Sequence, residues 1–315
     1  MSRKITIIGA GSVGATIAYT LSSEDIASEL VLIDINRDKA EGEALDIVQG
    51  TCFRDPISMI SGDYEDARGS DIVIITSGIA RKPGQTRLEL TQTNVDILKE
   101  ITPQIVKEAP DAIYIIVSNP VDIMTYVFTK TSGLPEKQIL GSGTILDTAR
   151  LRCGISEHFK VAQGNIHAYV FGEHGDSSFI PWTGAYVSGV NTTEYYEIMK
   201  AHDSSITPID REAMLEYVQK SGGKIIAKKG ATFYAIATAV CKLAGMILAA
   251  SDSVTTVSTM MHGEYGIEDV CLSILTLIGP NGVSGRIPMR MNKAEIAQLQ
   301  KSADALKSVI AQIDL

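Results

Sequence analysis

The chain has 315 residues, of which 45% are hydrophobic and 21% charged, and its 28 basic and 37 acidic side chains give a net charge of −9. This length accommodates two domains of ordinary size, and the composition is that of a globular protein. The acidic balance argues against nucleic acid or an anionic membrane as a partner, so local arginines would have to attract any anionic substrate.

The four cysteines, Cys52, Cys153, Cys241 and Cys271, are widely spaced and include no Cys-x-x-Cys pair. This usage indicates free thiols in a reducing compartment. The segment Met1–Lys4 runs directly into a predicted strand, which leaves no room for a signal peptide, and no apolar run reaches membrane-spanning length. We therefore expect a cytoplasmic protein, and we predict no metal site.

A glycine-rich turn, Gly9-Ala-Gly-Ser-Val-Gly14, joins a predicted strand at Lys4–Ile8 to a predicted apolar helix at Ala15–Leu21. The first glycine permits the tight turn, the second lets the backbone approach a pyrophosphate, and the third allows close packing of helix on strand. The helix N-terminus would face the phosphates. The cofactor-binding residues predicted from this turn are Gly9, Gly11, Ser12, Val13 and Gly14.

A second predicted strand, Glu29–Ile35, carries Asp34, which lies 20 residues beyond Gly14, where an acid would meet the ribose hydroxyls of adenosine. The carboxylate favours NAD over NADP because it would repel a 2′-phosphate. A glycine turn of this kind also occurs in methyltransferases and in plain tight turns, and an aspartate at a strand end can simply cap a helix. The complete order of strand, turn, helix, strand and acid predicts NAD as cofactor.

Strands and helices alternate through the first half of the chain, which implies a doubly wound parallel sheet of the Rossmann type. Ligands bind outside the carboxyl ends of such strands. We therefore expect the substrate chemistry in the segments that follow Thr76 and Val117. The further predicted elements are helices at Arg37–Val48 and from about Leu88 to Glu108, and strands at Asp71–Thr76, Ala112–Val117 and Ile139–Thr144.

Each of these two segments carries candidate substrate-binding residues. Arg81 and Arg87 follow the first strand in a segment rich in glycine and proline, although a charged surface loop has the same composition. Asn119 follows the second strand and precedes a proline, which favours an extended backbone. Its amide could serve a substrate carbonyl or the nicotinamide, or the Asn-Pro pair could only form a turn.

Three residues further along suit acid–base chemistry on an acid substrate. His174 lies in a glycine-bracketed turn after an apolar run, where an imidazole can exchange protons near neutral pH or merely cap the turn. Asp147 and Arg150 are three residues apart on a predicted helix and hence on one face, which is also the spacing of a surface salt bridge. In a cleft, they would supply a carboxylate for His174 and a clamp for a substrate carboxylate.

The C-terminal half reads as an α+β substrate domain, residues 144–315, after a dinucleotide-binding domain, residues 1–143. Its last helix begins at Asn292 in a capping-box pattern, and Thr232 lies in the first predicted turn of an apolar helix. The other predicted elements are a strand at Pro181–Gly189, a helix at Pro208–Lys228 broken at Gly222-Gly223, an apolar helix from Gly230 to about Ala250, and antiparallel strands at Val254–Thr259, Val270–Leu277 and Gly285–Arg290.

Together these motifs resemble the L-lactate/L-malate dehydrogenase family over essentially the whole chain. The resemblance implies that His174 donates and accepts the proton, Asp147 orients it, and Arg150 clamps the substrate carboxylate. It further implies that Arg87 polarises the carbonyl, Asn119 bonds the same oxygen, and Thr232 lines the pocket. The segments that carry it are Gly9–Gly14 with Asp34, Arg81–Arg87, Ser118–Asp122, Leu146–Arg150 and Gly172–Asp176.

The resemblance leaves the substrate open between a 2-keto monoacid and a diacid. Arg81 matches the malate branch, since its guanidinium could pair with the second carboxylate of oxaloacetate. Opposite the methyl group of pyruvate the same charge would be unpaired unless it turned to water. The segments at 141–144, 172–177 and 230–234 look like the bacterial lactate branch. We favour lactate, with malate or dual specificity as the alternative.

Two features indicate assembly and regulation. Arg152 and His167 match positions that bind the phosphates of fructose 1,6-bisphosphate at a subunit interface in bacterial enzymes of this type, although they could equally be ordinary packed side chains. The predicted helix at Arg37–Val48 is similar to a dimer contact of the family. We expect a homotetramer, with a dimer as the alternative. A non-enzymatic NAD-binding protein is the main competing class, and it would leave His174, Asp147 and the arginines unused.

Overall fold

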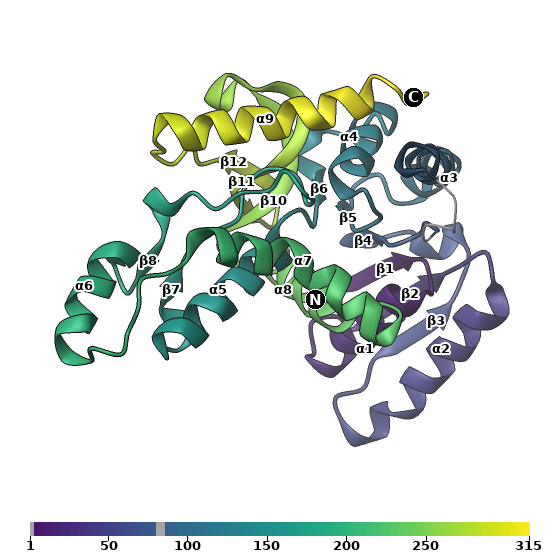
Figure 1. The fold of residues 1–315 in the computed structure, drawn as a ribbon. Helices are drawn as coiled ribbons and strands as arrows, with labels where there is room; N and C mark the ends of the chain where they lie inside the picture. Colours follow the sequence, from purple (N-terminus) through teal and green to yellow (C-terminus); the bar gives the residue numbers. More distant parts are fainter. Residues whose placement is uncertain (1–2, 80–85) are drawn as a thin grey trace.

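The computed structural model describes residues 3–79 and 86–315, and one large sheet organises them (Figure 1). The sheet has nine strands in the order β12-β11-β10-β6-β5-β4-β1-β2-β3. The six strands from β6 to β3 are parallel to one another, whereas β10, β11 and β12 pair antiparallel. A Rossmann-type parallel sheet therefore continues into the strands of the C-terminal half.

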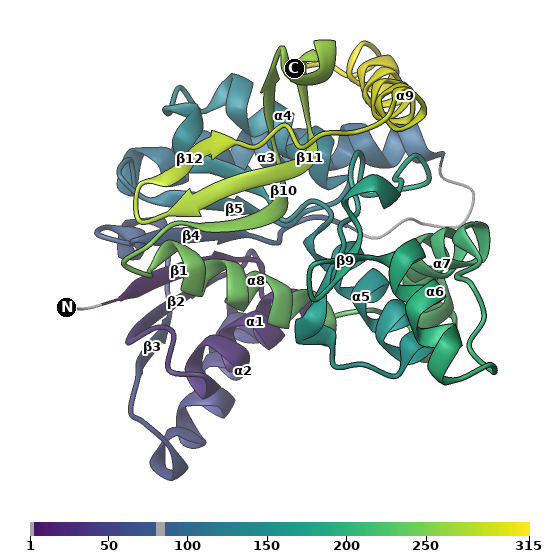
Figure 2. The same ribbon diagram turned by 90° about the vertical axis from the view of Figure 1, so that its left-hand side faces the viewer.

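Helices cover both faces of this sheet (Figure 2). Helices α1, α2 and α8 pack on one face around Ile5 and Ile7, and α3, α4 and α9 pack on the other around Ile8 and Ile75. Because both faces are covered, the central strands are apolar in consecutive positions. The nine α-helices among the described residues are α1 (Ser12–Ser23), α2 (Arg37–Gln49), α3 (Arg87–Glu108), α4 (Val121–Thr131), α5 (Ile145–Phe159), α6 (Thr192–His202), α7 (Arg211–Lys229), α8 (Tyr234–Ile247) and α9 (Lys293–Ile310).

A second, small sheet of order β7-β8-β9 lies in a lobe with α5, α6 and α7, where a separate apolar cluster includes Leu151, Ile155 and Val218. This lobe stands beside the carboxyl ends of the parallel strands. The strands in the described part of the chain are β1 (Lys4–Ile8), β2 (Glu29–Ile33), β3 (Ser58–Ser61), β4 (Ile72–Ile75), β5 (Ile113–Ile116), β6 (Ile139–Gly141), β7 (Ile166–His167), β8 (Tyr186–Val187), β9 (Val190–Asn191), β10 (Ser253–His262), β11 (Glu268–Gly279) and β12 (Gly282–Arg286).

The antiparallel strands predicted in the C-terminal half are confirmed, since β10, β11 and β12 pair antiparallel. Their junction with the first half was not predicted: Ser258 of β10 pairs with Gly141 of β6 and so extends the parallel sheet. The close approach of β10 and α4 to β6 needs a residue without a side chain. A Cβ on Gly141 would lie 2.2 Å from the Thr125 hydroxyl and 3.0 Å from the Ser258 Cβ. The local strand pattern could not reveal this pairing.

Several predicted boundaries were wrong. The predicted strand at Pro181–Gly189 is a short 3-10 turn at Trp182–Gly184 followed by two strand residues, because only Tyr186 and Val187 find partners. The predicted break at Gly222-Gly223 does not exist: α7 runs continuously through both glycines. Tertiary packing of its apolar side against α5 outweighs their low helix propensity, about 1 kcal/mol each.

Other elements agree more closely. The last helix begins after Asn292 with the predicted capping box, in which Asn292 and Glu295 each accept a backbone N–H of the other. The helix after the glycine turn begins earlier than predicted, at Ser12, so part of the turn is already helical. Strand β3 and helices α4 and α6 were not predicted. In the described segments, no helix is both long and apolar enough to cross a bilayer.

Candidate active site

A cleft of about 510 Å³ opens at the carboxyl ends of β1, β4 and β5, where the small lobe meets the large sheet. The cleft reaches Ile79, the last described residue before 80–85. Six of the sequence-predicted site residues line it, although they come from five separate parts of the chain. These are Val13 from the glycine turn, Asn119 after β5, Asp147 and Arg150 on α5, His174, and Thr232 before α8.

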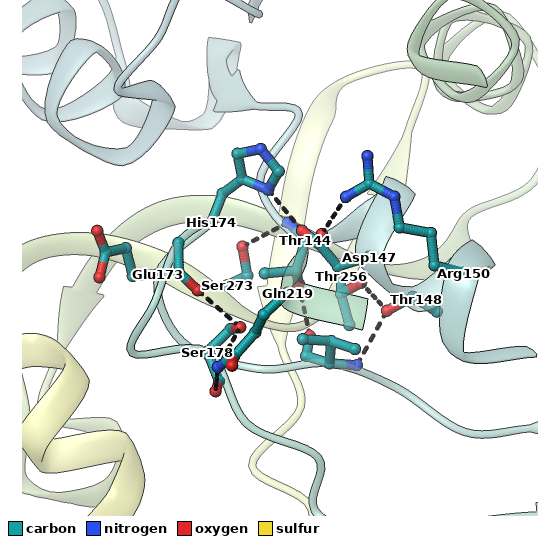
Figure 3. Close-up of polar contacts among 12 residues, drawn as sticks. Thr144, Asp147, Thr148, Arg150, Glu173, His174, Ser178, Gln219, Thr256 and Ser273 are labelled. Atoms are coloured by element: carbon teal, nitrogen blue, oxygen red, sulfur yellow. Dashed lines mark hydrogen bonds and ion pairs between the residues drawn. The ribbon is translucent and has the colours of Figure 1, made fainter. Parts of the chain in front are cut away.

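His174, Asp147 and Arg150 form one connected group in the cleft (Figure 3). The Nδ1 of His174 lies 2.5 Å from Oδ2 of Asp147, and Nη1 of Arg150 donates to the other oxygen, Oδ1, over 2.8 Å. The Asp147 side chain is 6% exposed, whereas that of His174 is 29% exposed. Since Nδ1 is engaged with Asp147, Nε2 is the nitrogen that can exchange a proton with a ligand.

The electrostatics of this group favour a charged imidazole. Asp147 raises the pKa of His174 above its usual value, and this effect outweighs the burial that would lower it. Burial alone would raise the pKa of the Asp147 carboxyl, but the charges and hydrogen bonds of His174 and Arg150 hold it below its usual value. Asp147 is therefore an anion over the neutral range, and His174 readily carries a proton.

The turn that carries His174 is held from three further helices. Its backbone N–H donates to Oδ2 of Asp122 on α4 over 2.7 Å, and the N–H of Glu173 donates to the Ser302 hydroxyl on α9 over 2.8 Å. From α7, the amide of Gln219 donates to the carbonyls of Asp176 and Ser178, each at 3.0 Å. The imidazole thus sits on a turn fixed by distant parts of the chain.

Sequence reasoning did not identify Asp122, Ser302 or Gln219. The only local signal was for Asp122, an acid at the second position of the apolar run Val121–Phe128, which follows Asn-Pro after a buried strand. That run is α4, which was not predicted. Ser302 and Gln219 lie on predicted helices, and nothing in their neighbourhoods along the chain distinguishes them from ordinary helix residues.

The glycine turn has the shape that a dinucleotide requires. A Cβ on Gly14 would lie 1.8 Å from the Gly9 carbonyl oxygen, so only glycine lets α1 begin this close to β1. A Cβ on Gly11 would meet nothing within 4 Å, which leaves open space over the turn. Gly11 is also the N-cap of α1, and no described side chain caps the helix. Its first N–H groups are free for an anion, so the residues fit a pyrophosphate.

Asp34 follows β2 directly and braces this turn. One carboxylate oxygen accepts the N–H of Ala10 over 2.6 Å and the other accepts the N–H of Asn36 over 2.8 Å. The carboxylate is half-buried at the end of the strand, beside the turn. It therefore orders the loop in addition to any contact with a ribose.

The structure describes some of the remaining predicted residues but not all of them. Arg81 lies outside the described residues, and Arg87 is the first residue of α3. Asn119 is exposed and precedes Pro120 through a cis peptide bond, and its carbonyl accepts the amide of Asn94 over 2.8 Å. Thr232 lies two residues before α8, not in its first turn as predicted, but it does line the cleft.

Arg152 and His167 lie away from the cleft on the small lobe. Nε of Arg152 donates to the Ala168 carbonyl over 3.2 Å, and its guanidinium stacks 5.0 Å above the centre of the Tyr169 ring. His167, next in the chain to Ala168, is exposed. The two residues are thus neighbours through the 167–169 segment.

The chain matches two family models end to end. Residues 3–141 match the NAD-binding domain of lactate/malate dehydrogenase, and residues 144–314 match the alpha/beta C-terminal domain of the same family. The chain is 45% identical to L-lactate dehydrogenase 1 of Clostridium acetobutylicum, with 98% of each chain covered, and 46% identical to the L-lactate dehydrogenase of a Thermoanaerobacter species, with 99% of each covered.

Solved structures agree with this match. The minor L-lactate dehydrogenase of Enterococcus mundtii, in a ligand-bound form, is 37% identical and superimposes with a TM-score of 0.94 over 100% of this chain and 99% of that one. A lactate dehydrogenase from a deep-sea metagenome library superimposes with a TM-score of 0.93 at 34% identity, over 98% of each chain. The chain belongs to the lactate/malate dehydrogenase family.

Proposed function

We propose that this protein is an NAD-dependent L-lactate dehydrogenase that interconverts pyruvate and L-lactate. The observation that carries the proposal is the group of His174, Asp147 and Arg150 in a cleft beside a dinucleotide-binding turn. It combines a proton donor, the carboxylate that orients it and a cation for a substrate carboxylate. The relatives named as L-lactate dehydrogenases support pyruvate as the substrate.

NADH, when bound, supplies a hydride to the carbonyl carbon of pyruvate. Gly9, Gly11 and Gly14, with Ser12, Val13 and Asp34, would hold the dinucleotide, and Asn119 would contact the nicotinamide or the substrate carbonyl. Nε2 of His174 gives its proton to the carbonyl oxygen, so that one hydride and one proton turn the ketone into the alcohol. Asp147 stabilises the imidazolium before the transfer and keeps Nδ1 protonated after it.

The arginines and Thr232 would select and orient the acid. Arg150 binds the substrate carboxylate as a charge-assisted pair, and its contact with Asp147 fixes its position relative to His174. Arg87, at the start of α3, would polarise the reacting carbonyl, and Thr232 would line the pocket.

The test is NADH oxidation with pyruvate by the wild type and by His174→Asn. We expect the substitution to lower kcat by about 10²–10⁴-fold while NADH binding is retained. His262→Asn is the matched control, because that histidine is exposed and pairs with Glu136 far from the cleft. Turnover by His174→Asn at the wild-type rate would overturn the catalytic assignment.

Arg81 gives the malate alternative its specific basis, and it can be tested directly. We expect kcat/KM for pyruvate to exceed that for oxaloacetate in the wild type, with Arg81→Gln lowering only the oxaloacetate value. If the wild type prefers oxaloacetate and the substitution inverts the preference, Arg81 binds the second carboxylate and the enzyme is a malate dehydrogenase.

We further propose a homotetramer in the cytoplasm, with two functional domains that meet at residues 143/144. Fructose 1,6-bisphosphate would bind at Arg152 and His167, where a cation and an exposed imidazole are neighbours. Light scattering tests the assembly. Titration of the sugar bisphosphate at subsaturating pyruvate tests the activation, which should be lost in Arg152→Gln. Absence of any response in the wild type would exclude this regulation.

A further inference from the structure

Behind the catalytic histidine lies a buried acid that the mechanism above does not use. Asp122 is the second residue of α4 and is 2% exposed. Its Oδ2 accepts the backbone N–H of His174 over 2.7 Å. Its other oxygen, Oδ1, is fully buried and has no hydrogen-bond partner in the described structure.

The Ser258 hydroxyl, on β10 where that strand joins the parallel sheet, is fully buried next to Asp122. The two side chains do not meet in a hydrogen bond of normal geometry, yet Ser258 lowers the pKa of Asp122 as a hydrogen-bonding neighbour. Burying a carboxylate costs its desolvation even beside such a neighbour, so Asp122 is an expensive residue if it only anchors a backbone N–H.

We propose that Asp122 is a positioning residue that acts as a second carboxylate of His174. Through Oδ2 it fixes the main chain that delivers the imidazole to Asp147, and its charge stabilises the protonated ring. Asp147 would thus stabilise the imidazolium through its bond to the ring nitrogen Nδ1. Asp122 would stabilise it through its negative charge and through the hydrogen bond that holds the His174 backbone.

The electrostatics around Asp122 agree with this role. Burial raises the pKa of Asp122 to about 6, while Ser258, the His174 N–H and the imidazole charge oppose the rise. Above that pKa the carboxyl is ionised, and its charge adds to that of Asp147 in raising the pKa of His174. The first turn of α4 also favours an anion at this position.

Other charged groups face this pair from the elements packed around it. Glu173, in the histidine turn, raises the pKa of Asp122, and Arg150, on α5, lowers that of His174. The Cys271 thiol, on β11, is neutral because burial raises its pKa far above the physiological range. Of these groups Asp122 is the one whose charge can be removed while its hydrogen bond to the turn is kept.

The decisive variant is Asp122→Asn. Its amide oxygen can still accept the His174 N–H, and its NH2 group can donate to the Ser258 hydroxyl, so that the position is kept and only the charge is lost. We measure kcat/KM against pH in both directions, because pyruvate reduction needs the imidazolium and lactate oxidation needs the neutral ring. We expect both midpoints to move down by about one pH unit.

The control removes the carboxylate of Asp269, which lies on β11 and contacts the last turn of α4. Asp269 is exposed and pairs with Lys130 on α4, so Asp269→Asn should leave both midpoints at their wild-type values. A purely structural role for Asp122 predicts a lower rate at every pH with unmoved midpoints, and that result would overturn the proposal. Circular dichroism and NADH binding establish that each variant is folded.

Asp122→Ser supplies a second neutral variant of smaller volume, and it should move the midpoints in the same direction. If neither neutral variant folds, the carboxylate is a folding determinant and the proposal is wrong. The inference rests on the proposed function, but different experimental results would refute the inference and the function. Full activity of His174→Asn would refute the function, whereas unmoved midpoints in Asp122→Asn would refute only the role of Asp122.

Discussion

The two turns that build the active site are made in opposite ways. The glycine turn at residues 9–14 owes its shape first to the close approach of Gly14 to Gly9, and Asp34 and Thr76 bond to it from the ends of β2 and β4. The histidine turn is held by four helices that lie far apart in the sequence, through Asp147, Asp122, Ser302 and Gln219. The cofactor end is thus a sequence motif, whereas the catalytic end is a product of tertiary structure.

The difference has a functional reason. A pyrophosphate is bound by backbone N–H groups, which any short segment of the right conformation can present. A proton donor needs a fixed ring position, a fixed tautomer and a tuned pKa, and these require several side chains from different directions. Substitutions in the glycine turn should therefore impair cofactor binding, whereas substitutions around the histidine turn should impair catalysis.

The largest effect is expected at the glycine turn, from Gly14→Ala. Its methyl group would lie 1.8 Å from the Gly9 carbonyl oxygen, so strand and helix must separate. We expect a loss of stability of about 3 kcal/mol by urea unfolding and loss of NADH binding by fluorescence. Gly11→Ala is the matched variant: its methyl group meets nothing, so stability should be nearly unchanged. Equal stabilities for the two variants would contradict the local account.

Asp147→Asn should affect the histidine turn alone. Without the carboxylate, the imidazolium loses its main stabilising charge and the ring its fixed tautomer. We expect kcat/KM for pyruvate to fall by about 10²–10⁴-fold, with the NADH dissociation constant unchanged. Asp304→Asn, at an exposed position on α9, is the control. A parallel loss of NADH binding would mean that the two turns are not independent.

The dependence of the rate on pH separates the same two regions. Asp147 raises the pKa of His174, so pyruvate reduction should remain on its plateau through neutral pH. Above that pKa the donor is deprotonated, and the rate should fall about tenfold for each pH unit. Lactate oxidation needs the neutral ring and should rise over the same interval. NADH binding, which depends on the glycine turn, should stay flat, and a matching titration of NADH binding would refute the separation.

Ser302→Ala removes the α9 anchor of the histidine turn. The Ser302 hydroxyl is fully buried, accepts the Glu173 N–H, and contacts the Ser177 hydroxyl at 2.9 Å. We expect a loss of about 1–2 kcal/mol in the free energy of unfolding, together with a lower kcat, because the Glu173 N–H loses its partner. Ser308→Ala, at an exposed position of the same helix, should change neither quantity.

The smallest effect is expected from Gln219→Ala on α7. Its amide bridges two carbonyls that are less buried than the Ser302 hydroxyl, so water can replace it in part. We expect a loss of about 0.5–1 kcal/mol and a small decrease in kcat. The neighbouring exposed residue supplies the control, Lys220→Ala. If Gln219→Ala costs more than Ser302→Ala, α7 and not α9 is the principal support of the turn.

The sequence by itself determined the features that depend on neighbours along the chain. The glycine turn and Asp34 follow from backbone conformation and spacing, the buried parallel strands follow from their apolar runs, and the last helix follows from its capping box. His174, Asp147 and Arg150 were identified because acid–base chemistry on an anionic substrate calls for those residue types after the end of a strand. The resemblance to the family implied the catalytic or binding role of each of them.

Tertiary structure decided the rest, because the deciding partners are distant in sequence. No local pattern shows that Ser258 pairs with Gly141 and joins the antiparallel strands to the parallel sheet. None shows that α7 stays helical through Gly222-Gly223, since packing on the small lobe outweighs propensity there. Above all, the placement of Asp122 behind His174 appears only when α4 and the histidine turn, 52 residues apart, are brought together by the fold.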